Sequence, residues 1–377
     1  MKRALGTLFE IGSGGTPSKA HPEYYGGDIP WVKTGDLKEE YLHSVEDYIT
    51  EAGLHNSSAK VYESGTVLVA MYGATIGATS ILRFPACTNQ ACAAFKPSKE
   101  VIPEYLYYFL RSKKQKFIQD GVGGAQPNIS AGYLKKIEME VPCLYEQEKI
   151  VKKLDIANEL TNKKRTVIKA LDDLIKARFV EMMNSAELSE ETTIEAITKR
   201  VKVGFVGTCE KYYTDASGIP MLRTGNITDN GIDLADLKYV TPEFHEKNKK
   251  SQIHEGDLLI ARHGSNGQAN VYYGPEAQCL NAVIIVPNYE MTTSVFLAGL
   301  INSPIVKEQI EHTLVGSTQH VVNTKSIAGL VVRIPDLTVQ KEYEAFVEQV
   351  DKSKVAIHKS LEKTQLLFDS LMQKYFG

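Results

Sequence analysis

The sequence predicts an α+β protein with two similar globular domains, each followed by a long helix, and the two helices pair as an antiparallel coiled coil. Three observations lead to this class. The chain repeats its own pattern once, each copy consists largely of short strand-like runs, and each copy ends in a long amphipathic segment without Pro or Gly. We therefore expect a pseudo-symmetric molecule made of two domains and two long helices.

The internal repeat keeps its anchors in one order, about 190 residues apart. The segment 28–37, DIPWVKTGDL, is echoed by 218–227, GIPMLRTGNI. Further matching pairs follow in sequence: 64–73 with 255–264, 88–91 with 280–283, Gln126 with Gln319, Val141-Pro142 with Ile334-Pro335, and Gln147 with Gln340. Coincidence does not keep so many anchors collinear, so the pattern indicates a true duplication.

Within each copy, short runs rich in β-branched and aliphatic residues are separated by Gly, Asn, Asp and Ser, which is typical of strands and turns. Clear examples are 66–71 and 282–286. A helix is expected at 104–116, with a counterpart near 293–311 in which Pro304 marks a break or a second helix start. Each copy is therefore expected to fold as a mixed α+β domain.

The two long segments, 144–184 and 337–377, carry apolar residues at intervals of three and four, and neither Pro nor Gly occurs in 147–183 or 341–376. Polar residues interrupt both seams, Thr161 and Lys164 in the first and Lys354 and Thr364 in the second, and polar seam residues can fix register. A helix of roughly 36 residues is about 55 Å long, so its apolar stripe needs a partner. Antiparallel pairing of the two helices would place the domains at opposite ends; the alternative is that each helix packs on its own domain or on another chain.

Composition excludes several classes of protein. With 43% hydrophobic and 24% charged residues, and without an apolar stretch of membrane-spanning length or a signal-peptide core after Met1-Lys2-Arg3, the chain is expected in the cytoplasm. The five cysteines are scattered and lack CxxC spacing, which favours reduced thiols over disulfides or a zinc site. We therefore predict no metal and no cofactor in this chain.

The net charge of −3 does not by itself indicate a nucleic-acid-binding protein, although phosphate contact needs only a local basic face. Basic runs do occur at 113–116, 199–202 and 247–250. A solvated helix or loop surface is the simpler interpretation of these runs, and contact with phosphates is the alternative.

Glycine-rich polar loops at 12–18, 121–128 and 316–320 are the most unusual local features. None of them has the GxxxxGK[ST] spacing of a nucleotide-binding loop. They either supply turns that need positive φ or allow backbone and short polar side chains to approach a duplex closely. The nine histidines form no HExxH pair and no GxSxG elbow occurs, so the pattern favours a binding protein over a catalyst.

Taken together, these motifs resemble the specificity (S) subunit of type I DNA restriction-modification systems over essentially the whole chain. The segments that carry the resemblance are 12–18, GSGGTPS; 29–37, IPWVKTGDL; 121–130, GVGGAQPNIS; and Val141-Pro142 followed by 146–151, EQEKIV. The second copy departs from the pattern at 203–207, VGFVG, and at Gln319-His320. Two domains that recognise different half-sites are expected to share a fold and to differ where they meet base edges.

The resemblance implies that 1–143 and 185–336 are target-recognition domains, each reading one half of a split DNA target. The helices 144–184 and 337–377 would be spacers that set the gap between half-sites and dock two methyltransferase subunits, with restriction and translocase subunits joining for cleavage. Adenine methylation with S-adenosylmethionine, and translocation driven by ATP and Mg²⁺, would belong to those partners. Domains about 50 Å apart would be centred roughly one and a half turns apart on B-DNA.

Polar residues in glycine-flanked loops, at equivalent places in both copies, are the candidates for DNA contact, because Arg, Gln and Asn can bond base edges and short side chains allow close approach. In the first copy they are Ser13, Thr16, Lys33, Thr34, Tyr72, Gln126 and Asn128. In the second copy they are Arg223, Thr224, Arg262, His263, Gln319 and His320.

Three other functions are compatible with parts of the pattern. A solitary DNA-binding protein could recruit a different effector, and a coiled-coil scaffold could use its domains to bind protein. An enzyme with two pseudo-symmetric sites would need matched catalytic groups, yet the residues that match between the copies are mostly Gly, Pro, Thr and aliphatics.

Overall fold

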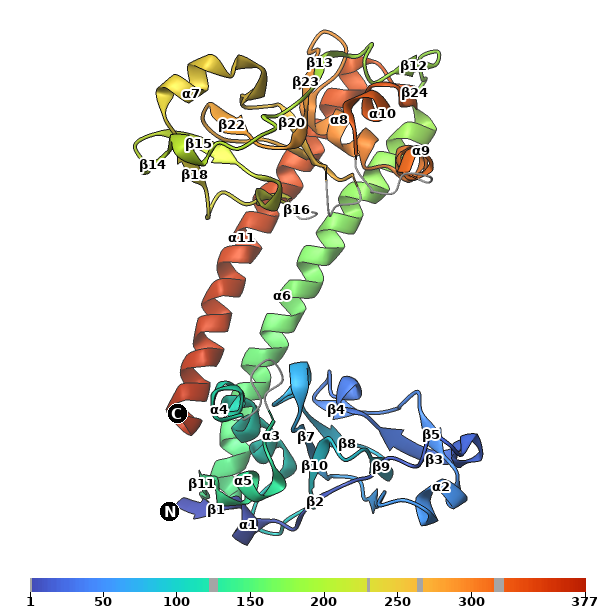
Figure 1. The fold of residues 1–377 in the computed structure, drawn as a ribbon, viewed down its shortest axis with the longest axis vertical. Helices are drawn as coiled ribbons and strands as arrows, with labels where there is room; N and C mark the ends of the chain where they lie inside the picture. The colour runs from blue at the N-terminus through green and yellow to red at the C-terminus, as the bar shows by residue number, and fades with distance from the viewer. Residues whose placement is uncertain (1, 122–127, 229–230, 263–266, 315–321) are drawn as a thin grey trace. The chain divides into compact units, whose positions relative to one another are not determined.

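The computed structural model describes residues 2–121, 128–228, 231–262, 267–314 and 322–377, and the chain divides into two compact units. Unit 1 is Met1–Arg165 with Lys359–Gly377, and unit 2 is Thr166–His358. Each unit contains one copy of the sequence repeat and a part of both long helices, α6 (Leu144–Ser185) and α11 (Leu337–Phe376) (Figure 1).

Unit 1 is a mixed α+β domain. Its helices besides α6 and α11 are α1 (Leu5–Leu8), α2 (Glu51–His55), α3 (Pro103–Ser112), α4 (Lys114–Asp120) and α5 (Ala131–Lys136). Its strands are β1 (Lys2–Ala4), β2 (Ile11–Ser13), β3 (Tyr25–Val32), β4 (Tyr41–Leu42), β5 (Tyr48–Ile49), β6 (Val61–Tyr62), β7 (Val67–Ala70), β8 (Thr79–Leu82), β9 (Ala86–Thr88), β10 (Cys92–Phe95) and β11 (Glu138–Glu140). The two larger sheets have the orders β2-β10-β7-β8-β4 and β5-β3-β9-β6.

Unit 2 has the same general plan but differs in its smaller helices and strands. Its helices are α7 (Pro242–Lys247), α8 (Ser294–Ile301), α9 (Pro304–Leu314) and α10 (Thr324–Ala328). Its strands are β12 (Thr192–Thr193), β13 (Thr198–Val203), β14 (Tyr213–Thr214), β15 (Ile219–Leu222), β16 (Ile227–Thr228), β17 (Gly231–Ile232), β18 (Lys238–Val240), β19 (Gln252–Ile253), β20 (Leu258–Ala261), β21 (Ala269–Val271), β22 (Ala277–Cys279), β23 (Ala282–Pro287) and β24 (Val331–Val332). The larger sheets have the orders β13-β23-β20-β21 and β14-β18-β15-β22-β19.

The strand register confirms the duplication and shifts the alignment of the two copies by one residue at one turn. The parallel pair β3–β9 aligns Val32 with Thr88, and the parallel pair β15–β22 aligns Leu222 with Cys279. The following residue then bonds back in the same way, since the amide of Asn89 donates to the Val32 carbonyl and that of Leu280 to the Leu222 carbonyl. Leu280 is thus the counterpart of Asn89, whereas sequence matching paired Asn89 with Asn281, because the second copy has a turn one residue shorter.

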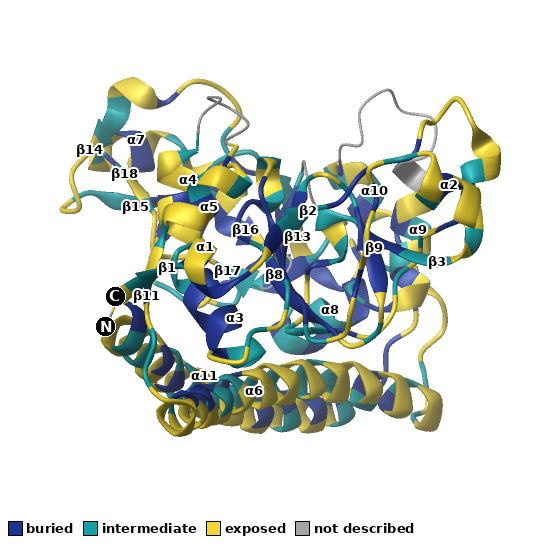
Figure 2. Ribbon diagram, turned by 90° about the horizontal axis from the view of Figure 1, so that it is seen from below, coloured by how far each residue is buried: buried dark blue, intermediate teal, exposed yellow. Residues whose placement is uncertain are grey.

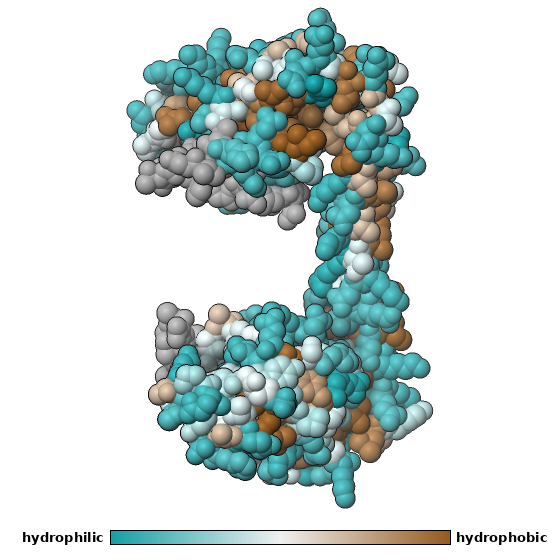
Figure 3. All heavy atoms as spheres, turned by 90° about the vertical axis from the view of Figure 1, so that its right-hand side faces the viewer, coloured by the Kyte–Doolittle hydropathy of each residue, from teal (hydrophilic) through white to brown (hydrophobic). Residues whose placement is uncertain are grey.

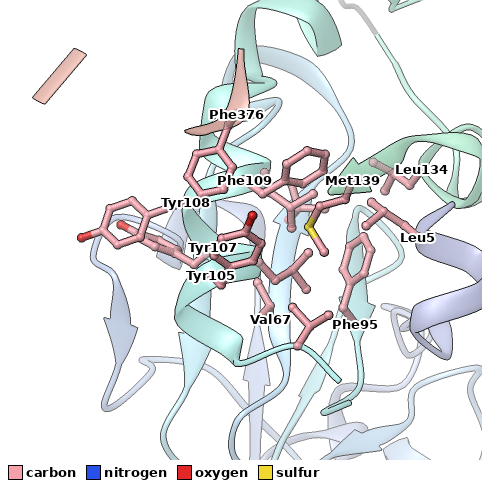
Figure 4. Close-up of a cluster of buried hydrophobic side chains, with 14 of the residues drawn as sticks. Leu5, Val67, Phe95, Tyr105, Tyr107, Tyr108, Phe109, Leu134, Met139 and Phe376 are labelled. Atoms are coloured by element: carbon pink, nitrogen blue, oxygen red, sulfur yellow. The ribbon is translucent and has the colours of Figure 1, made fainter. Parts of the chain in front are cut away.

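The expected helix at 104–116 is two helices in the structure, α3 and α4, which meet at Lys113. The predicted break at Pro304 is confirmed, because α9 begins there, two residues after α8 has been capped by Asn302. In unit 1 a cluster of buried apolar side chains joins α3, the main sheet, α6 and the end of α11, and it includes Tyr105, Phe109 and Phe376 (Figure 4). The helix pair and the sheet therefore share one core in this unit.

The predicted antiparallel pairing of the two helices is confirmed within each unit. In unit 1, Lys153 Nζ bonds the Tyr375 hydroxyl, and Lys164 Nζ, farther along α6, bonds the Ser360 carbonyl and the Thr364 hydroxyl. In unit 2, Asp172 pairs with Lys354 at 2.7 Å, and the rings of Phe179 and Tyr343 lie 5.4 Å apart. The polar seam residues Lys164 and Lys354 are thus paired across the helices, and each helix buries one face while the other stays exposed (Figure 2).

A buried glutamine ties each long helix to its own domain. Gln147 Nε2 donates to the carbonyls of Pro142 and Glu100, and its Oε1 accepts from the Ile102 amide. Gln340 makes the matching bonds to Pro335, Met291 and Thr293, and both side chains are fully buried. Because a buried polar group without a partner is costly, these bonds fix where each helix leaves its domain. We call the two arrangements the glutamine clasps.

Candidate nucleic-acid interface

In each unit, several loops meet where the parallel strand pair ends. In unit 1, the amide of Asn89 bonds the Val32 carbonyl at the end of β3, and the amide of Met71, just after β7, bonds the Ala91 carbonyl. We define the polar edge of unit 1 as Lys33, Thr34, Tyr72, Gln90 and Asn128, which lie on or beside these loops. The polar edge of unit 2 is Arg223, Thr224, Arg262 and Asn281.

Lys33 begins the polar edge of unit 1, directly after β3. Its amide donates to Asp36 Oδ2 at 2.7 Å, which starts the short helical turn that contains Thr34. Its ammonium forms an ion pair with Asp47, and this hydrogen bond raises the pKa of Lys33. The ammonium is therefore paired with a carboxylate while the side chain stays about 42% exposed.

Arg223 occupies the same position in unit 2. Its amide donates to Asn226 Oδ1 at 2.9 Å, and its Nη2 lies 2.9 Å from both the carbonyl and a carboxylate oxygen of Asp236. The two units thus place a cation at the same point of the fold and pair it with an aspartate from a later segment. The sequence predicts the same equivalence of Lys33 and Arg223, because both residues follow the Ile-Pro pair of the repeat.

Tyr72 and Asn128 are brought together although 56 residues separate them in the sequence. They form an isolated antiparallel bridge, and the next amide, that of Ile129, donates to the Met71 carbonyl at 3.0 Å. The Tyr72 side chain is 41% exposed, although the preceding residue, Met71, is buried in the core. An exposed ring beside an exposed amide is suited to contact with a polar, partly apolar ligand such as a base edge.

The glycine-rich opening of the chain packs tightly against the rest of unit 1. Gly12, Gly14 and Gly15 are not among the residues with positive φ, so the expected turn role is wrong for them. A Cβ on Gly14 would instead come within 1.7 Å of the Thr88 carbonyl oxygen, and one on Gly15 within 2.2 Å of Ser58 Oγ. These glycines are required by close backbone approach inside the domain.

The two other candidates in this segment lie near the polar edge. Thr16 Oγ1 donates to Gln90 Oε1 at 2.5 Å, in the turn between β9 and β10. Ser13 ends β2 opposite Ala93, and its carbonyl accepts from the Tyr62 hydroxyl. Thr16 is therefore part of the same neighbourhood as Lys33, and Ser13 supports the sheet beside it.

The polar edge of unit 2 is organised around Asn281. Arg262 Nη1 donates to Asn281 Oδ1 at 3.0 Å, Arg262 Nε donates to the Val322 carbonyl at 3.3 Å, and the Thr224 hydroxyl donates to the Asn281 carbonyl at 3.3 Å. Asn281 has φ of 53° and is the one non-glycine residue with positive φ in the described part of the chain. A backbone in this region is costly for most residues and is tolerated best by Asn.

Two of these contact residues, Gln90 and Asn281, were not predicted as site residues. Both occupy the turn that sequence matching had singled out as a repeated anchor, and a polar residue in such a turn was the available signal. Four of the predicted residues, Gln126, His263, Gln319 and His320, lie outside the residues that the structure describes.

Within the described ranges, no group of three or more His, Cys, Asp and Glu side chains could hold a metal ion. All five cysteines are free, and burial raises the pKa of Cys87 to about 11 and those of Cys92 and Cys279 to about 12, so these three thiols stay protonated. No described helix combines the length and apolarity needed to cross a membrane. The polar edges thus offer hydrogen-bond donors and cations, and this chemistry suits binding.

Comparison with known proteins gives consistent similarities. The family model described as "Type I restriction modification DNA specificity domain" matches residues 1–170 and 205–366. The MjaIX specificity subunit of Methanocaldococcus jannaschii, a type I restriction enzyme subunit, is 24% identical over 390 residues, which cover 97% of this chain and 90% of the relative. A type I restriction enzyme specificity subunit of Escherichia coli is 31% identical over 165 residues, or 41% of each protein.

Two solved structures share the fold over the whole chain. The S subunit of a type I restriction-modification system from M. genitalium has a TM-score of 0.60 at 15% identity and covers 100% of this chain and 96% of that one. A chain from a study of complex assembly and conformational transition of the type I system has a TM-score of 0.59 at 16% identity, with coverage of 100% and 97%.

Proposed function

The chain belongs to the type I restriction-modification DNA specificity family, and we propose that its two globular repeats each recognise one half of a split DNA target. In this family role the chain is the DNA-recognition subunit and performs no catalytic step. The recognition domains are residues 1–143 and 185–336, and the helices 144–184 and 337–377 act as spacers. S-adenosylmethionine, ATP and Mg²⁺ are used by partner subunits.

The observation that carries this proposal is a pair of polar edges with different side chains on a shared scaffold. A protein that reads two unrelated half-sites needs one fold twice with two different sets of donors and acceptors. Unit 1 offers Lys33, Tyr72 and Asn128, whereas unit 2 offers Arg223 and Arg262 at neighbouring positions of the same fold. These side chains are our candidates for DNA contact, together with Ser13, Thr16, Thr34 and Thr224.

Four further candidates complete the set, and they lie in the loops outside the described residues: Gln126, His263, Gln319 and His320. They follow directly from the sequence repeat. Glutamine can make a bidentate bond to adenine, and the two glutamines occupy matching places in the two copies.

Partner binding is supported by apolar side chains on the outer face of α6. In unit 1, Ile156 and Leu160 are 51% and 45% exposed; in unit 2, Val167 and Leu174 are 45% and 46% exposed. Apolar patches interrupt the otherwise hydrophilic surface along the helix (Figure 3). These residues are separate from the seam with α11, and exposed apolar stripes of this kind mark protein interfaces. We assign them to two methyltransferase subunits, with restriction and translocase subunits joining the complex.

Methylation sequencing tests the proposal. DNA from cells that express this chain with its partner methyltransferase subunit is compared with DNA from cells that express the methyltransferase alone. We expect methyl-adenine in a split motif only when this chain is present. Assembly of the complex without any methylated motif would favour a scaffold, and tight binding to DNA by this chain without the methyltransferase would favour a solitary DNA-binding protein.

A further inference from the structure

Within the described residues, the guanidinium of Arg262 is held by neutral groups. Its Nη1 donates to the side-chain oxygen of Asn281 at 3.0 Å, and its Nε donates to the main-chain carbonyl of Val322 at 3.3 Å. No ion pair joins Arg262 to a carboxylate of the described residues, whereas Arg223 in the same unit pairs with Asp236. Arg262 is thus oriented at two nitrogens, and no carboxylate of the described ranges neutralises its positive charge.

Asn281 is itself fixed, so it can orient Arg262 precisely. Its amide donates to the Phe205 carbonyl at 2.9 Å, and its carbonyl accepts from the Thr224 hydroxyl. Its left-handed backbone, with φ of 53°, is imposed by the short turn between β22 and β23. Because Arg262 can only donate, the side-chain amide of Asn281 must point its oxygen toward the guanidinium, and this leaves the NH₂ group turned elsewhere.

The arrangement presents hydrogen-bond donors without acceptors of comparable strength. A guanidinium has five N–H donors, and the bonds within the described part of unit 2 use two of those of Arg262. In the DNA major groove, guanine alone presents two acceptors, O6 and N7, on one edge, and Arg is the residue that most often bonds both.

We infer that Arg262, positioned by Asn281, recognises a guanine in the half-site bound by the second repeat. This inference rests on the proposed function and names the base class read by one of its residues. Asn281 acts as a positioning residue, since it holds the guanidinium rather than the base. Unit 1 lacks this device, because the residue equivalent to Arg262 is Met71, which is 2% exposed and packs in the hydrophobic core.

The equivalence of Met71 and Arg262 follows from the hydrogen bonds. The Met71 carbonyl accepts from the amide of Ile129 at 3.0 Å, and the Arg262 carbonyl accepts from that of Val322 at 3.1 Å. Each residue directly follows an interior strand of its sheet, β7 or β20. The guanine contact is therefore specific to the second half-site.

Three variants of the full chain, each expressed with the methyltransferase partner, test the inference by methylation sequencing. Arg262→Lys keeps a charge but loses the planar fork. Asn281→Gly removes the side chain yet accepts the left-handed backbone, and Asn281→Asp keeps an acceptor while neutralising the guanidinium. Unfolding midpoints of the purified complexes verify that each variant is folded.

We expect the wild-type motif to contain a guanine in its second half-site. In Arg262→Lys, other bases should be tolerated at that position, with a loss of discrimination of about 5- to 150-fold at that base pair alone. Asn281→Gly should reduce discrimination at the same base pair to a smaller degree. Asn281→Asp should weaken binding to all sequences and reduce the slope of log affinity against log salt by about one. The first half-site should be unchanged in all three.

Two results would overturn the inference while leaving the proposed function intact. One is a loss of sequence discrimination in the first half-site, and the other is an unchanged motif in both Arg262→Lys and Asn281→Gly. A wild-type chain that directs no methylation would instead reject the proposed function, and the guanine contact with it. Loss of folding in Asn281→Asp alone leaves the decision with the other two variants, because Arg262→Lys does not alter the turn.

Discussion

Units 1 and 2 are most alike where the long helices leave the domains and most different where the strands end in polar loops. The glutamine clasps of Gln147 and Gln340 reproduce each other bond for bond, including the bond to the proline carbonyl five residues earlier. At the polar edges, by contrast, the buried Met71 of unit 1 corresponds in the repeat to Arg262 of unit 2, which bonds Asn281. The attachment of helix to domain is kept constant between the copies, and the surface assigned to DNA varies.

The cores beneath these features are filled differently in the two units. In unit 1, Tyr108 on α3 donates to Asp155 of α6 at 2.7 Å and packs near Phe368. The equivalent residue in unit 2 is Gly299, and a Cβ there would lie 2.9 Å from the Phe179 ring. In unit 1 the space is filled by Tyr108 of α3, whereas in unit 2 it is filled by Phe179 of α6. The two units thus reach the same helix pairing with different packing.

The largest expected effect is on this packing in unit 2. Phe179 is 5% exposed and lies against Phe296 and Tyr343, so Phe179→Ala should lower the stability of unit 2 by about 3–5 kcal/mol. Hydrogen exchange measured by mass spectrometry should localise the loss of protection to unit 2. The matched control is Val180→Ala, whose side chain is 44% exposed and whose effect should stay within about 0.5 kcal/mol. Equal loss of protection in unit 1 would contradict the separate filling of the two cores.

The glutamine clasps should give the next largest effect, and it should be the same in both units. Gln147→Ala and Gln340→Ala each remove three hydrogen bonds from a buried site, which should destabilise the respective unit by about 3 kcal/mol. Urea unfolding of the full chain measures the change, with exposed Gln349→Ala as the control. A loss in one unit only would show that the clasps are not equivalent.

A pH effect should distinguish unit 1. Burial, and secondarily the charge of Asp155, raises the pKa of Glu40 from its ordinary 4.5 to about 7. Between these values the unfolded chain loses its proton first, so stability should fall as pH rises from about 4.5 to 7 and level off above 7. Because Glu40 is partly exposed, screening should limit this to about 1 kcal/mol.

Glu40→Gln should therefore stabilise unit 1 at pH 8 and leave it nearly unchanged at pH 4. Unfolding at the two pH values, with local hydrogen exchange, measures this difference, and the exposed neighbour Glu39→Gln provides the control. A variant with the wild-type dependence on pH would show that Glu40 is not the responsible group.

The smallest effect on stability is expected at the paired cations. Asp47→Asn and Asp236→Asn remove exposed ion pairs to Lys33 and Arg223, so each should change stability by less than about 1 kcal/mol. Affinity for target DNA should rise in both, because the freed cation gains a phosphate or base partner without competition. Binding titrations at two salt concentrations test this, and reduced affinity would mean that the aspartates orient the cations for DNA.

Much of this architecture could be predicted from the sequence because it depends on local patterns. The duplication, the two long helices and the break at Pro304 follow from periodicity and from the missing amide of proline. The break at Lys113 was not predictable, since no Pro or Gly marks it. The partners in the polar edges were also beyond the sequence, because contacts such as Arg262 with Val322 join residues 60 positions apart.

The glycine-rich opening shows the same limit in another form. The sequence predicted that Gly14 and Gly15 matter, and the structure places their importance in close packing against Thr88 and Ser58. The glycines in the sequence indicate positions where a side chain does not fit. The atoms that leave no room for it come from distant parts of the chain, so only the fold shows them. The one-residue difference in the turn that contains Asn281 is of this kind, because strand pairing, rather than sequence similarity, reveals the correct equivalence.

The most direct test of the central claim is a chimera in which residues 191–335 are replaced by a second copy of residues 2–142. The copy carries Tyr108→Gly, because Gly299 at the equivalent position packs against Phe179. The replaced segment ends at the proline that precedes each helix, so both glutamine clasps keep their partners. With the methyltransferase subunit present, methylation sequencing should show a motif made of two copies of the first half-site. A motif that retains the original second half-site would contradict the account, because recognition of that half would then lie outside the second repeat.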